Sequence, residues 1–131
     1  MLRNVTSNDR KEIYKIIKDE FDYDYKSDNP FTKWIIYEID NKIVGFINFN
    51  YIYDEIELIY IYVDEKYRRK GIASILMNEM IKLNNKKIIL EVRESNLKAI
   101  SLYEKFNFKK LYIRKKYYGN EDAIIMSRSW W

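Results

Sequence analysis

Apolar residues recur along the chain with two spacings, one typical of strands and one of helices. Strand patterns cover residues 2–5, 34–39, 43–52, 56–63, 87–92, 108–117 and 122–127. Helical spacing joins Ile13, Ile16, Ile17 and Phe21, then Ile72, Ile75, Leu76, Met80 and Leu83, and finally Leu97, Ile100, Leu102, Tyr103 and Phe106. This order predicts an α/β fold in which a mixed, mostly antiparallel sheet has helices on both faces.

The strand at residues 56–63 is predicted to lie at the centre of that sheet. Its two alternating sets of side chains, which begin with Ile56 and with Glu57, are both rich in apolar residues. Apolar side chains on both faces are typical of a strand that is covered on both sides.

Cap and turn signals separate these elements. Thr6 followed three residues later by Asp9 resembles a capping box, and either Ser95 or Asn96 is the N-cap of the last helix. Tight turns are predicted at residues 40–41 and 54–55, a loop at residues 21–30, a left-handed helix C-cap at residues 84–85, a turn at Asn107 and a hinge near residues 119–120.

The composition indicates one globular domain over residues 1–131. Hydrophobic residues make up 47% of the chain and charged residues 34%, with only three glycines and one proline, which argues against disorder. Cysteine and histidine are both absent. Their absence excludes disulfides, thiolate metal sites and Ser-His or Cys-His nucleophile systems, so a carboxylate, a tyrosine or a lysine must move protons in any enzyme with this sequence.

Charge and hydropathy bear on compartment and partners. No apolar run reaches the length of a membrane span and the N-terminus lacks a signal-peptide layout, so the predicted compartment is the cytoplasm, without a membrane partner or a metal. The net charge of +4 is concentrated at residues 66–70 and 109–116. These stretches are either solvated faces or sites for acidic ligands or a ribonucleoprotein neighbourhood, with no direct nucleic-acid contact required.

The stretch at residues 61–73 is the main candidate binding site. A strand pattern gives way to a basic turn that contains Gly71 and then to a helix, so residues 68–73 would present backbone N–H groups at a helix N-terminus. Together with the helix dipole and the cations Arg68, Arg69 and Lys70, these donors favour an anionic ligand such as a phosphate. The alternative is a basic turn that is simply solvated.

With the strand at residues 90–93 and Asn96, this stretch resembles the GNAT superfamily of acetyl-CoA-dependent N-acetyltransferases. In that family the signature Arg/Gln-x-x-Gly-x-Gly/Ala binds the coenzyme pyrophosphate through backbone amides, and Arg68, Gly71 and Ala73 hold those places here. The resemblance implies acetyl-CoA as the acetyl donor. It assigns the donor to Ile61, Tyr62, Val63, Arg68, Arg69, Lys70, Gly71, Ile72, Ala73, Asn96 and Tyr103.

A finer pattern resembles one branch of the family, the ribosomal-protein-alanine N-acetyltransferases and related N-terminal acetyltransferases. It covers residues 90–108 and, in the last hairpin, residues 114–126. Two features depart from the family. Asn107 replaces a common glycine, which Asn tolerates in the left-handed conformation, and the segment at residues 22–33, one wall of the family's peptide site, is short and lacks a helix.

Glu91 and Tyr103 are the predicted catalytic residues, because they match the general base and the leaving-group acid of the family. Desolvation on a buried strand suits a carboxylate to take a proton, directly or through a water, and a phenol with a reference pKa of about 10 stays protonated until a thiolate forms. The structural alternatives are a salt bridge for Glu91 and a core position for Tyr103. Asn96 caps the helix, bonds the pantetheine arm, or does both.

The expected activity is direct transfer of acetyl, in a ternary complex, to the N-terminal α-amine of a protein, with a ribosomal protein as the expected acceptor. An α-amine, with a pKa of about 7.7 to 8.0, loses its proton more easily than a lysine at about 10.4. The first alternative is acetylation of a small amine or polyamine held by the acidic segment at residues 22–28, and the second is a non-catalytic acyl-CoA-binding module. Tyr117 and Tyr118 are candidates for the acceptor groove, with Glu121 and Asp122 near the amine; the oligomeric state and the role of Trp130 and Trp131 stay open.

Overall fold

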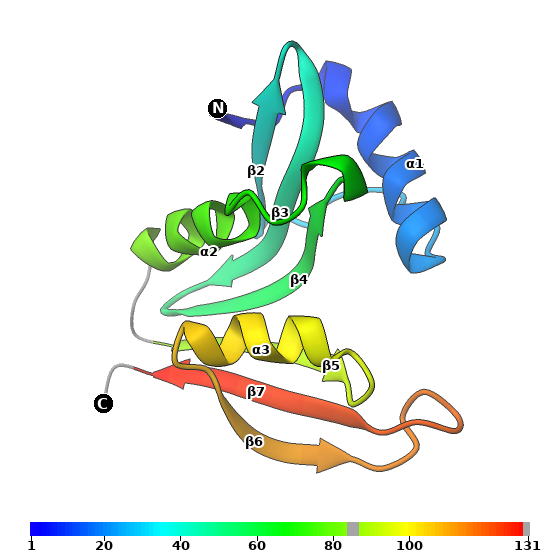
Figure 1. Cartoon of the computed structure of the whole chain (residues 1–131), viewed down its shortest axis with the longest axis vertical. Helices are drawn as coiled ribbons and strands as arrows, with labels where there is room; N and C mark the ends of the chain where they lie inside the picture. The colour runs from blue at the N-terminus through cyan, green and yellow to red at the C-terminus, as the bar shows by residue number, and fades with distance from the viewer. Residues whose placement is uncertain (84–86, 130–131) are drawn as a thin grey trace.

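The sheet of this protein runs in the order β1-β2-β3-β4-β5-β7-β6 (Figure 1). The computed structural model describes residues 1–83 and 87–129. Its elements are β1 (Leu2–Asn4), α1 (Arg10–Phe21), β2 (Thr32–Ile39), β3 (Lys42–Ile52), β4 (Glu55–Val63), α2 (Ile72–Leu83), β5 (Lys87–Arg93), α3 (Leu97–Lys105), β6 (Lys109–Arg114) and β7 (Ala123–Ser129), with 3-10 turns at Ser7–Asp9 and Glu65–Tyr67. The predicted succession of elements is confirmed.

Strand pairing in the sheet is antiparallel everywhere except between β4 and β5, which run parallel. This confirms the expected mixed, mostly antiparallel sheet. The β2–β3 hairpin turns at Asp40 and Asn41, whose φ angles of 50° and 63° are the left-handed values that a two-residue hairpin turn requires.

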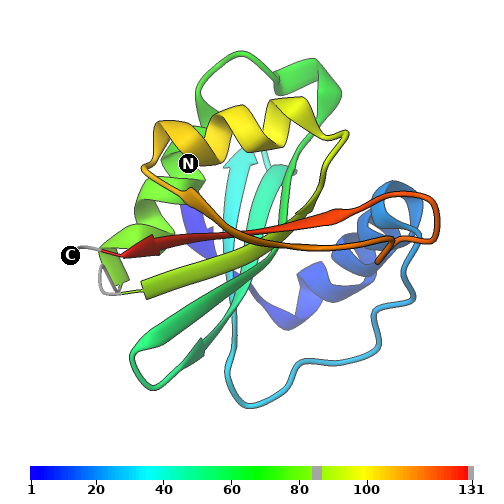
Figure 2. The same ribbon diagram turned by 90° about the horizontal axis from the view of Figure 1, so that it is seen from below.

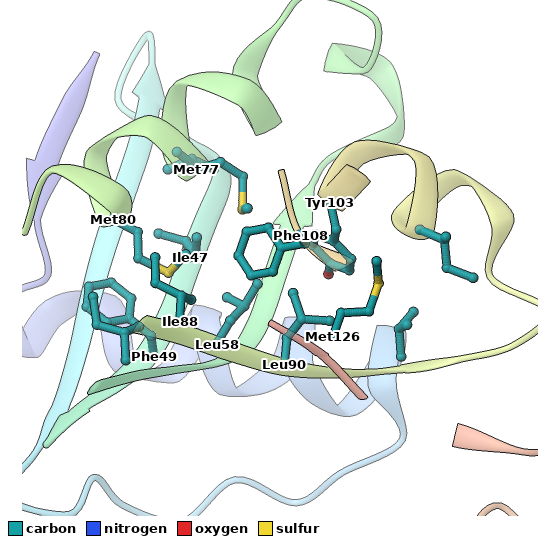
Figure 3. Packing of buried hydrophobic residues seen from close by; sticks show 14 of the residues in the cluster. Ile47, Phe49, Leu58, Met77, Met80, Ile88, Leu90, Tyr103, Phe108 and Met126 are labelled. Carbon is teal, nitrogen blue, oxygen red and sulfur yellow. The ribbon is translucent and has the colours of Figure 1, made fainter. Parts of the chain in front are cut away.

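Helices cover both faces of the sheet, as expected (Figure 2). On one face, Ile13 and Ile17 of α1 belong to a buried cluster with Trp34, Ile36 and Phe46. On the other, α2 and α3 pack over a larger core (Figure 3), which includes Ile47, Phe49, Leu58, Met77, Met80, Ile88, Leu90, Tyr103, Phe108 and Met126. Among the described residues, no helix is long and apolar enough to cross a bilayer.

Several predicted limits of elements shift in the structure. The turn before β4 lies at residues 53–54 rather than 54–55, and β6 ends at Arg114 because residues 115–122 fold into a turn. Asn107 has a φ of 69°, which is consistent with the expected left-handed turn. The predicted C-cap at residues 84–85 lies outside the described residues, as do Trp130 and Trp131.

The start of α1 is held by a carboxylate network around Asp9. Its Oδ2 accepts a hydrogen bond from the Thr6 amide at 2.8 Å, which confirms the predicted capping interaction. Arg3 donates to both Asp9 oxygens, at 2.7 and 2.9 Å. These Arg3 hydrogen bonds, with the Thr6 donors, lower the pKa of Asp9 to about 2.

Strand β4 is central, as predicted, but it is not covered on both faces along its length. It pairs with β5 only from Glu55↔Lys87 to Glu57↔Ile89, and beyond that point the two strands part (Figure 1). Glu57, the last residue paired with β5, and Ile59 beyond it are both exposed, so the expected burial of this set is wrong there. The parting opens the sheet at the C-terminal half of β4, and the candidate site lies at that opening.

Candidate active site

Some residues of the turn between β4 and α2 have backbone conformations that favour glycine over other amino acids. Asp64 accepts a hydrogen bond from the Lys66 amide at 3.0 Å and starts the 3-10 turn at Glu65–Tyr67. Arg69 and Gly71 then take φ angles of 64° and 80°. A Cβ on Gly71 would meet nothing within 4 Å, so glycine is favoured there by conformation and leaves the approach to the backbone open.

Backbone N–H groups lie close together at the end of this turn. Helix α2 begins at Ile72, so its first amides lack partners within the helix. The amides of Arg69, Lys70 and Gly71 have no hydrogen-bond partner in the described part of the chain. This arrangement suits an anion such as a phosphate.

A cleft with a volume of about 590 Å³, the coenzyme cleft below, lies beside this turn. Of the residues predicted to bind the donor, it is lined by Ile61, Tyr62, Val63, Arg68, Arg69, Gly71, Ile72, Ala73 and Asn96. Of the predicted set, Lys70 and Tyr103 do not line it; the Lys70 Nζ lies 5.6 Å from the centre of the Tyr67 ring. The Arg68 side chain is partly engaged, since its Nε donates to the Val63 carbonyl at 3.0 Å.

Sequence reasoning missed the wall that α3 contributes to the coenzyme cleft. Lys98, Ala99, Leu102 and Lys105 line it, at the i, i+1, i+4 and i+7 positions of one helix face. The two lysines add positive charge opposite the basic turn. The helical spacing of these two lysines is visible in the sequence, so the polar face of α3 is the signal that identifies them.

A second cleft, also about 590 Å³, lies between the parted strands and is the acceptor cleft below. Its lining includes Leu58, Ile59, Tyr60, Glu91, Val92, Tyr103, Tyr112, Arg114, Tyr117 and Tyr118. Phe21, Ile61, Asn96 and Ala99 line both clefts. The two clefts therefore adjoin, and a long ligand held at the basic turn reaches the acceptor cleft with its far end.

Glu91 lies in the acceptor cleft because of the alternation along β5. Ile88, Leu90 and Val92 are buried in the core, which leaves Glu91 on the opposite face. Its Oε2 accepts a hydrogen bond from the Tyr118 hydroxyl at 2.9 Å, and its Oε1 lies 3.4 Å from Arg114 Nη1. The expected desolvated setting is wrong: the Glu91 side chain is 28% exposed, and the salt bridge considered as the structural alternative is present.

Tyr103 lies on α3 at the boundary between the core and the acceptor cleft (Figure 3). Its ring packs at 5.8 Å from that of Phe108, and only 7% of the residue is exposed. Burial raises the pKa of Tyr103 to about 12. The core position considered as an alternative is thus real, and the phenol keeps its proton throughout the neutral range.

Two acidic residues of the last hairpin do not lie where the sequence placed them. Glu121 accepts a hydrogen bond from the Ser95 amide at 2.8 Å, and Asp122 accepts one from the Lys116 amide at 2.8 Å. Neither lines a cleft. The expected position of both near an incoming amine is wrong, because Glu121 bonds to the segment before α3 and Asp122 to the turn at residues 115–122.

Within the acidic segment at residues 22–28, Asp28 has a structural role. Asp28 Oδ1 accepts hydrogen bonds from the Tyr25 hydroxyl at 2.6 Å and from Trp34 Nε1 at 3.0 Å. The Tyr25 ring packs edge-on against Trp34, 5.4 Å away. No residue of this segment lines either cleft, so the predicted pocket for a cationic substrate is wrong here.

Comparison with known proteins gives a consistent result. A model of the acetyltransferase (GNAT) family matches residues 2–108. An N-alpha-acetyltransferase of Saccharolobus solfataricus is 41% identical over 108 residues, covering 69% of this chain and 65% of that protein. A [ribosomal protein bS18]-alanine N-acetyltransferase of Salmonella typhimurium is 38% identical over 96 residues, covering 67% of this chain and 65% of that protein.

The matched part therefore spans slightly less than two thirds of the length of each of these two relatives. Among solved structures, the ribosomal-protein-S18-alanine N-acetyltransferase from Escherichia coli is similar over 98% of this chain and 92% of its own, with a TM-score of 0.87 and 26% identity. The expected fold family is confirmed.

Proposed function

This chain belongs to the acetyltransferase (GNAT) family, and on that premise we propose that it transfers acetyl from acetyl-CoA to the N-terminal α-amine of a protein. A ribosomal protein is the first candidate acceptor. The observation that carries the proposal is the junction of the two clefts at Asn96 and Ala99, which puts the coenzyme cleft in line with Glu91 and Tyr103. Transfer is direct, within a ternary complex of enzyme, donor and acceptor.

The residues of the coenzyme cleft fit an anionic nucleotide with a long polar arm. The turn amides near Gly71 and the cations Arg69, Lys98 and Lys105 would hold its phosphates. The C-terminal part of β4 has no β5 partner, so the main-chain groups on this edge at residues 61–63, apart from the Val63 carbonyl that accepts from Arg68, are available to the amides of the arm. When bound, the coenzyme supplies an acetyl thioester.

Glu91 is the proposed proton acceptor for the incoming amine, directly or through a water. A carboxylate has about four acceptor sites, so the contacts to Tyr118 and Arg114 leave acceptor capacity on both oxygens. An α-amine with a pKa of about 7.7 to 8.0 gives up its proton to such a base far more easily than a lysine at about 10.4.

Tyr103 is the proposed donor toward the leaving sulfur. Its phenol, with a pKa of about 12, is protonated when the reaction begins. A thiol has a pKa of about 8.5, so complete transfer of the phenolic proton to a thiolate would be uphill by about 5 kcal/mol. Donation of a strong hydrogen bond as negative charge develops is therefore its main contribution.

The named relatives support an N-terminal acceptor. Two of them are named for acetylation of an α-amine and of a ribosomal-protein alanine. The polyamine alternative has less support, because no residue of the acidic segment at residues 22–28 lines either cleft. The non-catalytic alternative is disfavoured because both candidate catalytic side chains line one cleft. The cytoplasm stays the predicted compartment.

The test is a thiol-release assay with acetyl-CoA and short peptides that begin with Ala, Ser or Met, with spermidine and a peptide blocked at its N-terminus as comparisons. We expect turnover on free N-termini, blocked by prior N-terminal acetylation and lost in Glu91→Gln. Faster turnover on spermidine than on every peptide would favour the polyamine function. Coenzyme binding without turnover of any amine would favour the non-catalytic module.

A further inference from the structure

The carboxylate of Glu91, which lies on β5, is contacted by two side chains from a later part of the chain. Tyr118, in the turn after β6, donates to Oε2 at 2.9 Å. Arg114, the last residue of β6, approaches Oε1 at 3.4 Å. Each carboxylate oxygen therefore has its own partner, and both partners come from the hairpin that also walls the acceptor cleft.

We propose that Tyr118 and Arg114 are positioning residues that fix the direction of the Glu91 carboxylate. The hairpin formed by β6 and β7 and the Glu91 side chain are then ordered together. This inference rests on the proposed function, in which Glu91 takes the proton of the amine. Tyr118 makes the main contact, because its hydrogen bond to the carboxylate is shorter than the contact of Arg114. Arg114 supplies a weaker, more exposed ionic contact.

Both positioning residues are themselves held in place. The Arg93 guanidinium lies 4.0 Å from the centre of the Tyr118 ring, and Arg93 also pairs with Glu121 at 3.3 Å. The Arg114 guanidinium lies 5.4 Å from the Tyr117 ring, and its Nη2 is 3.4 Å from the Tyr112 hydroxyl. The hydroxyl and the guanidinium thus reach Glu91 from preorganised positions, which is what an oriented base requires.

The other charged groups of the acceptor cleft are Glu57 on β4 and Arg93 on β5. Its other titratable groups are the tyrosines Tyr60 on β4, Tyr103 on α3, Tyr112 on β6 and Tyr117 in the turn after β6. Arg93 is committed to Glu121 and to the Tyr118 ring, and Tyr103 stays neutral. Removal of Tyr118 or Arg114 is therefore the most direct way to change the surroundings of the Glu91 carboxylate.

The first test compares Tyr118→Phe with Tyr25→Phe. Tyr25 also donates a hydrogen bond to a carboxylate, that of Asp28, but lies outside both clefts. We expect Tyr118→Phe to lower kcat about 10-fold with little change in the KM of either substrate, and Tyr25→Phe to leave kcat unchanged.

Arg114→Met should act in the same direction and more weakly, about 3-fold on kcat, while Arg114→Lys retains part of the effect. The matched control is Lys87→Met, which breaks a pair of the same 3.4 Å length outside the clefts. In a Glu91→Gln background neither positioning variant should lower the residual rate further. An effect confined to the acceptor KM, with kcat unchanged, would overturn the proposal and show that Tyr118 only lines the cleft.

A second readout does not depend on turnover. The Tyr118 amide bonds to the Glu121 carbonyl and the Gly119 amide to the Lys116 carbonyl, so amide exchange reports on the turn at residues 115–122. We expect Glu91→Ala and Tyr118→Phe to accelerate exchange there several-fold, with no change in Tyr25→Phe. Unchanged exchange rates in both variants would overturn the proposal that the hairpin is ordered together with Glu91. Absence of turnover of any amine by the wild-type protein would instead contradict the proposed function.

Discussion

The side-chain Oδ1 of Asn96 accepts a hydrogen bond from the Ala99 amide at 3.2 Å, and both residues line both clefts. Asn96 is therefore the N-cap of α3, which decides between the two caps, Ser95 and Asn96, that the sequence left open. The Oδ1 atom is used inside the protein, so the Nδ2 group is the one available to a ligand. One residue thus starts the helix and stands where the clefts meet.

Substitutions at Asn96 should separate these two roles. Asn96→Asp keeps the capping oxygen and should preserve the free energy of unfolding, but it replaces a donor by a negative charge and should weaken acetyl-CoA binding about 10-fold. Asn96→Ala loses the cap and should cost about 1 kcal/mol as well as affinity. Urea unfolding and calorimetric titration measure both quantities. Equal affinities for the wild type and Asn96→Asp would place the ligand away from this side chain.

Gly71 and Gly119 form a matched pair, because both have φ near 80° and neither would place a Cβ within 4 Å of another atom. Alanine at either position should cost about 1 kcal/mol of folding free energy, since a side chain disfavours this conformation. Only Gly71→Ala should also weaken coenzyme binding, because Gly71 belongs to the turn of the coenzyme cleft. Equal coenzyme affinities in both variants would argue against phosphate binding at this turn.

Tyr103→Phe should impair the chemical step while leaving the fold intact. The ring packs on Phe108, and the hydroxyl makes no hydrogen bond to any residue that the structure describes, so its loss should cost less than about 1 kcal/mol. We expect kcat to fall about 100-fold with little change in the KM for acetyl-CoA. Because the pKa of Tyr103 is about 12, the ratio of wild-type to variant kcat should stay constant from pH 7 to about 10. A ratio that collapses within that range would contradict the assignment.

Asp9 should make stability depend on acidity. Its pKa is lowered from 3.8 to about 2 by Arg3 and Thr6, so its ionised form stabilises the fold above pH 4 and the contribution is lost as the pH falls from about 4 to 2. Asp9→Asn should therefore cost about 2 kcal/mol at pH 7 and much less at pH 2. The control is Asp19→Asn, which removes an exposed 2.8 Å pair with Lys15 and should change the unfolding free energy little. Parallel pH profiles for the wild type and Asp9→Asn would contradict the prediction.

Local signals in the sequence were reliable where one short stretch decides the geometry. The turn at Asp40 and Asn41, the cap formed by Thr6 and Asp9, and the left-handed Asn107 all follow from the preferences of single residues. The position of β4 followed from its apolar alternation. Most residues of the coenzyme cleft were also identified, because one continuous stretch supplies them.

The surroundings of individual charged residues could not be read from the sequence. Glu91 and Arg114 are 23 residues apart, and their contact depends on β7 pairing between β5 and β6. Glu121 and Asp28 were misplaced for the same reason, since tertiary contacts chose among several possible partners. The early parting of β4 from β5 has no local signal at all, because the apolar pattern of β4 continues past the last paired residue.

That parting gives the protein an internal seam, bridged by three residue pairs of parallel strand and the helices packed above it. A ligand that binds along the free edge of β4 would supply the hydrogen bonds that β5 does not make there, and would link the two halves of the sheet. Coenzyme occupancy should therefore govern the rigidity of the whole molecule, because the place where the sheet is least continuous is also the place where its ligand is expected to sit.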